Sequence, residues 1–157
     1  MEARGEVCRE AVVHACIHAA GAEAEAGGIR AAADVREFAA ATGETSPLCH
    51  DVAAAHAAGY ADVVAPATFP IVVTLNAMGD AVTDPSVGVD WSMVVHGDQR
   101  FAYDRPVVAG DELTVKTEIE SIKALAGNDL ITLRGDLFAA DGSKIGSTWT
   151  SLVQRGA

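Results

Sequence analysis

Four runs of alternating apolar and polar residues fill the chain from residue 91 onward: WSMVVHGDQRFAYDRPV, ELTVKTEIESIKAL, LITLRGDLFAADG and KIGSTWTSLVQR. A period of two is typical of a β-strand with one buried and one solvated face. In the second run Leu113 and Val115 alternate with Thr114 and Lys116, and the alternation slips near Ser121. The turn sequences VAGD, AGND and AADGS separate the runs. We therefore predict an antiparallel meander with one buried face.

The segment before these strands, FPIVVTLNAMGDAV, is apolar on nearly every face. Such a segment predicts a helix that is buried on all sides, and Pro70 suits its first turn. Hydrophobic residues make up 50% of the chain and aromatic residues only 5%, so the core must use small and β-branched side chains. The predicted class is α+β: a curved antiparallel sheet wrapped around a central apolar helix in a single domain.

Two shorter helices are predicted earlier in the chain. Asp34 opens DVREFAAATG, and Asp51 caps DVAAAHAAG, with the loop TGETSPLCHD between them. The N-terminal stretch EVCREAVVHACIHA has helical spacing, and a short strand is possible over residues 28–32. We expect residues 1–32 to form a variable, helical N-terminal segment and residues 33–157 to form the domain.

Charge and cysteine content exclude several classes of function. The net charge of −11, from 11 Lys+Arg and 22 Asp+Glu, disfavours nucleic acid and anionic membranes as partners. Cys8, Cys16 and Cys49 lack metal-site spacing and indicate reduced thiols. The longest apolar stretch, VVAPATFPIVV, is too short to span a bilayer, and the N-terminus has no secretory signal pattern, so we expect a cytoplasmic protein.

Three blocks carry a resemblance to a known family: FAAATGETSPLCHDVAAAHAAGYADVVAPATFP, VVHGDQRFAYDRPVVAGDELTV and LAGNDLITLRGDLFAADG. They resemble the MaoC-like (R)-specific enoyl-thioester hydratases and 3-hydroxyacyl-thioester dehydratases over roughly residues 33–155. Within that family the chain is most similar to the actinobacterial N-terminal-dehydratase branch, which includes accessory subunits of heteromeric dehydratases. The resemblance implies a hot-dog fold, in which a curved sheet wraps a central helix.

The resemblance also implies where an active site would lie. Catalytic members carry Gly-Asp-x-Asn-Pro-Leu-His, in which the carboxylate and the imidazole hold a water molecule. The matching positions here are Gly43, Glu44, Ser46, Pro47, Leu48 and Cys49. The acid is thus kept one methylene longer, whereas a cysteine replaces the histidine. At the start of the central helix Ala65-Pro66-Ala67 replaces Ala-His-Gly, and the backbone N–H groups of Ala67 and Thr68 are candidate oxyanion donors.

Several assignments of these residues stay open on sequence alone. Glu44 and His50 are candidate catalytic residues, as a dyad displaced by one position. A one-residue shift on a helical turn rotates a side chain by about 100°, which turns His50 away from the site unless the loop changes register. The candidate substrate-binding residues are Cys49, Ala67, Thr68, Phe69, Val72 and Val73. Phe69, Val72 and Val73, with Leu75, either line an acyl tunnel or belong to the plain core, and Cys49 is interpreted as a small buried or half-buried thiol.

No metal site is predicted. His14 and His18 are spaced i, i+4 but have no comparable third ligand, and Cys49 beside His50 has no orienting group that would make it a nucleophile. Arg100, Arg105 and Lys123 are the cations best suited to face a phosphopantetheine or coenzyme A carrier.

We therefore expect a subunit of an (R)-specific 3-hydroxyacyl-thioester dehydratase or enoyl hydratase in fatty-acid or polyketide metabolism, which contributes acyl binding beside a catalytic MaoC-like partner. The substrate would be an acyl-ACP or acyl-CoA thioester, with no metal or redox cofactor. The alternatives are a homodimeric hydratase that uses Glu44 and His50, and a non-catalytic acyl-thioester binding protein. A hot-dog thioesterase that relies on Asp80 or Asn76 is a weaker alternative. The exposed sheet edge of this fold predicts a homodimer or a heterodimer.

Overall fold

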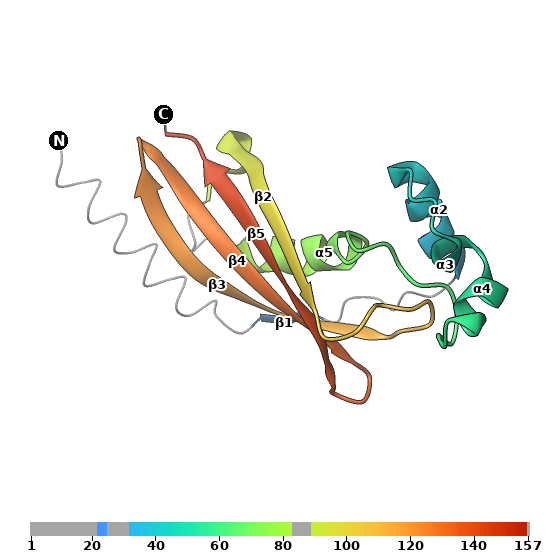
Figure 1. The fold of residues 1–157 in the computed structure, drawn as a ribbon. Helices are drawn as coiled ribbons and strands as arrows, with labels where there is room; N and C mark the ends of the chain where they lie inside the picture. The colour runs from blue at the N-terminus through green and yellow to red at the C-terminus, as the bar shows by residue number, and fades with distance from the viewer. Residues whose placement is uncertain (1–21, 25–31, 83–88, 157) are drawn as a thin grey trace, which may run out of the picture.

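An antiparallel sheet forms the framework of the molecule (Figure 1). The computed structural model describes residues 22–24, 32–82 and 89–156. The sheet has the order β1-β3-β4-β5-β2, and every neighbouring pair is antiparallel. Its strands are β1 (Ala22–Ala24), β2 (Val94–Tyr103), β3 (Leu113–Leu125), β4 (Asn128–Ala139) and β5 (Lys144–Gln154). The four predicted strands are confirmed, and the slip near Ser121 is a register shift between Ile119 and Ser121.

Helix α5 (Ile71–Val82) crosses one face of this sheet and contacts β1, β3 and β4. The contact is close because Gly135, at the centre of β4, has no side chain: a Cβ there would lie 3.1 Å from the Met78 methyl carbon. The sheet therefore curves around the helix as predicted. The prediction that the helix is buried on all sides is wrong, because Val72 and Leu75 are each 47% exposed. The sheet covers one side of α5, whereas the side that carries these two residues stays open.

The chain before α5 folds into three short helices that lie together (Figure 1). They are α2 (Ala32–Thr42), α3 (Pro47–His50) and α4 (Val52–Ala57). Gly43 ends α2 with a φ of 73°, in the left-handed region that glycine adopts without strain. The predicted cap is confirmed, since the Asp51 carboxylate accepts from the Ala53 N–H at 2.8 Å. The prediction of a plain loop over residues 42–51 is wrong in part, because Pro47 begins the single turn α3.

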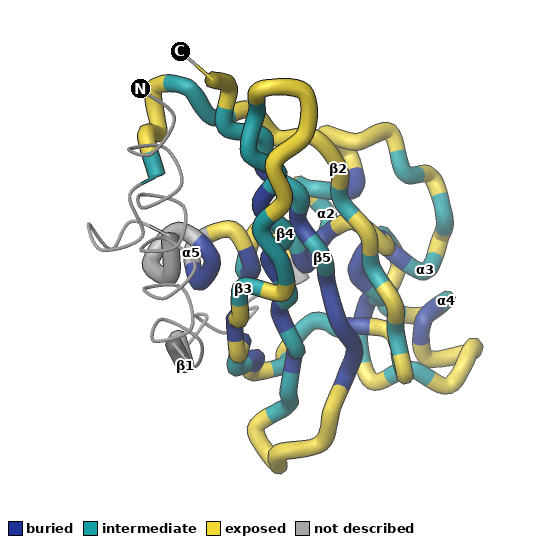
Figure 2. Tube along the Cα trace, turned by 90° about the vertical axis from the view of Figure 1, so that its left-hand side faces the viewer, coloured by how far each residue is buried: buried dark blue, intermediate teal, exposed yellow. Residues whose placement is uncertain are grey.

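Burial follows the alternation of the strands (Figure 2). Along β4 the buried residues Ile131, Leu133, Gly135 and Leu137 alternate with half-buried ones. The inner face packs in two groups, one around Val115, Leu137 and Ile145 and one around Met78, Leu133 and Leu152. As the composition predicts, both groups consist mainly of aliphatic side chains.

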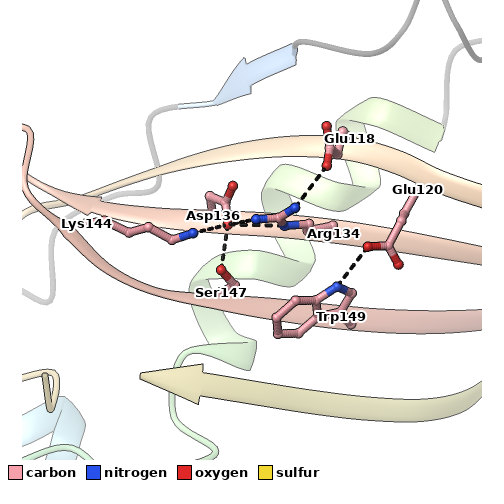
Figure 3. A network of polar contacts seen from close by, with 7 residues as sticks. All are labelled: Glu118, Glu120, Arg134, Asp136, Lys144, Ser147 and Trp149. Carbon is pink, nitrogen blue, oxygen red and sulfur yellow. Dashed lines mark hydrogen bonds and ion pairs between the residues drawn. The ribbon is translucent and has the colours of Figure 1, made fainter. Parts of the chain in front are cut away.

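The outer face of the sheet carries a polar network (Figure 3). The Asp136 carboxylate accepts from the Ser147 hydroxyl at 2.6 Å and pairs with Lys144 at 2.9 Å and Arg134 at 3.1 Å. Burial raises the pKa of Asp136, but the Ser147 and Lys144 hydrogen bonds and the Arg134 charge outweigh it, so the pKa lies below the ordinary value. The Trp149 indole N–H donates to Glu120 at 3.2 Å. The network links β3, β4 and β5 on the side away from α5.

Some expectations are corrected or lie outside the described residues. Residues Trp91–Met93 form the 3-10 turn η2, capped by the Asp90 carboxylate, where the alternation predicted the start of a strand. Strand β1 precedes the expected domain start at residue 33 and yet joins the sheet. The expected helix over residues 6–19 lies outside the described residues. So does the possible strand at 28–32, apart from Ala32, which opens α2. In the described segments no helix is both long and apolar enough to cross a membrane.

Candidate functional site

The loop that joins α2 to α3 holds Glu44 in place through its backbone and its side chain. The Glu44 N–H donates to Ala39 O at 2.8 Å, which ends α2. The Glu44 carboxylate turns back along the chain and accepts from the Ser46 N–H at 2.8 Å. It thereby satisfies a backbone donor just before Pro47 begins α3. In this arrangement Glu44 is a half-buried acid that stabilises its own loop.

The His50 imidazole faces the backbone of the same loop. Its Nε2 lies 2.6 Å from the Glu44 carbonyl oxygen, and the His50 carbonyl in turn accepts from Arg36 Nε at 2.9 Å. In the described part of the chain, no hydrogen bond or ion pair joins the His50 ring to the Glu44 carboxylate. The two candidate catalytic side chains thus share a loop but do not form a dyad in this structure.

Cys49 stands where the resemblance to the MaoC-like proteins implies a histidine. It lies on α3 and is only 5% exposed. Burial raises the pKa of the thiol above its ordinary value, and the nearby charge of Glu44 raises it further. A neutral, buried thiol is a poor proton acceptor and a poor proton donor at neutral pH. Cys49 therefore does not replace the imidazole chemically.

A cavity of about 320 Å³ lies beside this loop, between the chain leading into α5 and the end of β2. Its lining comes from two segments, residues 64–67 with Pro70, and residues 103–107. An isolated bridge between Val64 and Val108 brings these segments together. The Val64 N–H donates to Leu48 O at 2.8 Å, so the cavity wall is tied directly to α3.

The walls of the cavity are mostly apolar and rigid. Pro66, Pro70 and Pro106 contribute rings with a fixed φ. The Tyr103 hydroxyl donates to the Ala67 carbonyl, and burial raises the pKa of Tyr103 to about 12, so the phenol stays protonated. Arg105 brings the cavity's one cation, but both of its terminal nitrogens bind Asp111, at 2.8 and 3.0 Å. This hydrogen bonding raises the pKa of Arg105 and balances most of its charge.

The structure divides the other predicted site residues into three groups. Ala67 lines the cavity, and Thr68 is exposed beside it. Phe69 is buried in the core, edge-on to Phe38 with ring centroids 5.2 Å apart, and Val73 packs against the same core. Val72 is exposed on the open side of α5. Phe69, Val72 and Val73 are therefore not part of the cavity lining.

Sequence reasoning missed Tyr103 and the three prolines of the lining. The prolines lie within APATFP and DRPV, and their presence in both stretches is the one indication that the sequence offers. Of the three candidate carrier-facing cations, only Arg105 lines the cavity. Arg100 stacks on the Trp149 ring at 3.9 Å. Within the described residues, no group of three or more His, Cys, Asp or Glu side chains is arranged to hold a metal ion.

The family model for the FAS1-like dehydratase domain region matches residues 27–142. The chain belongs to this dehydratase family. A UPF0336 protein from Streptomyces avermitilis is 53% identical over 123 residues, which cover 78% of this chain and 82% of the relative. The residues that the family model matches include the candidate loop and both segments that line the cavity.

Solved structures place this FAS1-like dehydratase domain among the MaoC-like hot-dog proteins. A MaoC-like dehydratase is 32% identical, with a TM-score of 0.77 over 86% of this chain, which spans 41% of that protein's length. A chain of the HadBC (3R-hydroxyacyl-ACP dehydratase) complex from Mycobacterium tuberculosis is 30% identical to this chain. The TM-score is 0.71, and the match covers 83% of this chain and 89% of the HadBC chain. The predicted α+β hot-dog fold and the MaoC-like family are thus confirmed.

Proposed function

We propose that this chain is the acyl-binding subunit of an (R)-specific 3-hydroxyacyl-thioester dehydratase or enoyl hydratase, and that a catalytic MaoC-like partner supplies the acid and base. The observation that carries the proposal is the buried Cys49 thiol, which stands where the resemblance places the family's imidazole, on a helix whose Leu48 carbonyl is bonded to the wall of the apolar cavity. In this proposal the loop that carries Glu44 has a structural role, while the imidazole that would transfer protons is absent. The similarity to a subunit of the HadBC complex supports a heteromeric assembly.

The reaction explains why the missing imidazole matters. Dehydration removes a proton from C2 and a hydroxide from C3 of a 3-hydroxyacyl thioester, and hydration returns both. One group must take the C2 proton, and a protonated group must convert the leaving hydroxide to water. Because elimination of water changes no net oxidation state, we propose that no redox cofactor takes part. The neutral Cys49 thiol and the loop-bound Glu44 carboxylate are poorly suited to either task.

The cavity suits the acyl part of such a substrate. Its proline, alanine and valine walls offer apolar surface, and ligand sites of about 300–1,000 Å³ with such walls are common. Arg105 already pairs with Asp111, so the cavity attracts an anion only weakly. These features favour the acyl chain over the phosphate groups of the carrier.

Assembly would use the free edge of the sheet. Strand β2 ends the strand order, so one side of its backbone has no partner strand among the described residues. Two large apolar side chains near this edge, Trp91 and Val95, are 43% and 44% exposed. A second hot-dog sheet added along β2 would pair this backbone and cover both side chains.

The test is a paired enoyl-thioester assay that follows loss of the conjugated absorbance, with this chain alone and with a MaoC-like catalytic subunit. We expect turnover only in the mixture. Glu44→Ala and His50→Ala, made in this chain, should leave the mixture's rate unchanged within about twofold. Turnover by this chain alone that falls with either substitution would support the self-sufficient homodimer instead. Saturable acyl binding without turnover in any mixture would indicate a binding protein.

A further inference from the structure

We propose that Tyr103 sets the length of the acyl chain that the cavity accepts. This inference rests on the proposed function, because it assumes that the cavity binds the acyl group. Among the lining residues Tyr103 is the sole aromatic one, and it stands where the end of β2 meets the chain entering α5. A side chain in that place closes one side of the cavity.

The Tyr103 ring is held from two sides. Its hydroxyl donates to the Ala67 carbonyl on the opposite wall. Its face stacks on Phe101, two residues earlier on β2, with ring centroids 6.2 Å apart and planes 8° from parallel. A ring fixed in this way cannot turn aside for a longer ligand without losing its hydrogen bond. Tyr103 therefore limits the cavity more firmly than an unattached side chain of the same size.

The other walls are less able to set a length. Pro66, Pro70 and Pro106 belong to rigid backbone segments, and Ala67 is too small to reach across the cavity. Arg105 is committed to Asp111. Val64 and Val107 also line the cavity, but their side chains are much shorter than that of Tyr103. A change of side chain at Tyr103 alters the cavity's extent while leaving the backbone path and the ion pair in place.

This arrangement predicts that affinity rises with acyl-chain length only up to a limit. We call the length at which the rise stops the break. Each methylene that enters an apolar cavity adds about 0.8 kcal/mol, or about fourfold in affinity. The increment should stop once the chain reaches the Tyr103 ring. Replacing the ring by a smaller side chain should extend the rising part of the series, whereas a larger ring should shorten it.

The experiment measures binding of saturated acyl-pantetheine thioesters of increasing length to the full chain by calorimetry. Tyr103→Val removes the ring and suits a strand, and Tyr103→Trp enlarges it. Tyr103→Phe is the matched control, since it keeps the ring and removes only the bond to Ala67. We expect the break at a longer chain in the Val variant and at a shorter chain in the Trp variant. In the Phe variant the ring keeps its size and its stacking on Phe101 but loses the hydrogen bond, so the break should stay at the same length and become less sharp.

The possible outcomes separate the inference from the function on which it rests. A break at one length in all four proteins would overturn the role of Tyr103 and leave acyl binding in place. Equal weakening at every length would also overturn it, because a purely structural role predicts that result. If the unmodified chain binds no acyl thioester of any length, the proposed function fails and the Tyr103 inference falls with it. Should the Val variant not fold, the Trp and Phe variants decide the matter.

Discussion

Residue 49 carries much of the proposed function, because its side chain is a buried thiol on the short helix α3. Cys49 is smaller than histidine and fits a site that is 5% exposed. The loop's polar groups bind one another, with the Glu44 carboxylate on the Ser46 N–H and the His50 ring on the Glu44 carbonyl. The loop therefore holds its shape without the imidazole and water of catalytic relatives.

The buried thiol leads to a prediction about reactivity. Because the pKa of Cys49 is raised, its thiolate fraction at any given pH lies below that of a free cysteine. In a Cys8→Ser, Cys16→Ser background, an aromatic disulfide reagent should modify the folded chain at least about tenfold more slowly than the urea-unfolded chain. Glu44→Gln removes the second cause of the raised pKa, so it should speed the folded reaction modestly. Rapid labelling of the folded chain would contradict the burial of Cys49.

At the scale of elements, the approach of α5 to the sheet depends on Gly135. A Cβ at this position would lie 3.0 Å from Thr148 Cγ2, 3.1 Å from Met78 Cε and 3.3 Å from Val115 Cγ1. Thr148 and Val115 are buried, β-branched strand residues with little freedom to move. A side chain at position 135 would therefore crowd two rigid side chains of the neighbouring strands and the Met78 methyl group of α5.

We therefore expect Gly135→Ala to lower the free energy of unfolding by about 1–3 kcal/mol, as overpacking does in tight cores. Urea unfolding of the full chain measures this change. Met78→Ala should relieve part of the crowding, so the double variant should be less destabilised than the two single variants added together. A neutral or stabilising Gly135→Ala would show that α5 can move away from the sheet at little cost.

The same elements show what the sequence could predict. Alternation located all four long strands, and the all-apolar helix was found, because both patterns extend over ten residues or more. The turns α3 and η2 were missed, since four and three residues carry no measurable period. The open side of α5, with Val72 and Leu75, was also missed, because hydrophobicity alone does not tell how many sides are covered.

The site was harder to predict than the fold for a related reason. The rotation argument concerned only the direction of the His50 side chain, and nothing local indicated that its ring would lie on the Glu44 carbonyl. The cavity joins residues 64–70 to residues 103–107. The Val64–Val108 bridge and the hydrogen bonds from the Ala65 N–H to Val107 O and from the Tyr103 hydroxyl to Ala67 O make these segments neighbours. Contacts between segments so far apart in sequence follow from the fold, and no short motif encodes them.

For the molecule as a whole, charge determines which partner fits. The net charge is −11, so two copies of the chain repel each other across any shared interface. A partner with excess positive charge would instead be attracted before contact. In the proposed assembly a homodimer and a heterodimer would both use the exposed edge of β2, so shape alone does not distinguish them.

Salt distinguishes a homodimer from a heterodimer, because it screens electrostatic repulsion and attraction alike. Screening favours association of two like-charged copies and disfavours association with a cationic partner. The screening length falls from about 10 Å at 0.1 M salt to about 3 Å at 1 M. We expect association with a cationic MaoC-like partner to weaken as sodium chloride rises, mainly through a slower association rate. Self-association, where it occurs, should strengthen over the same range because repulsion is reduced.

Sedimentation velocity of the chain alone, and surface-binding kinetics with the partner, measure the two trends. Tight self-association at low salt that does not change with ionic strength would contradict the charge argument and favour the homodimer.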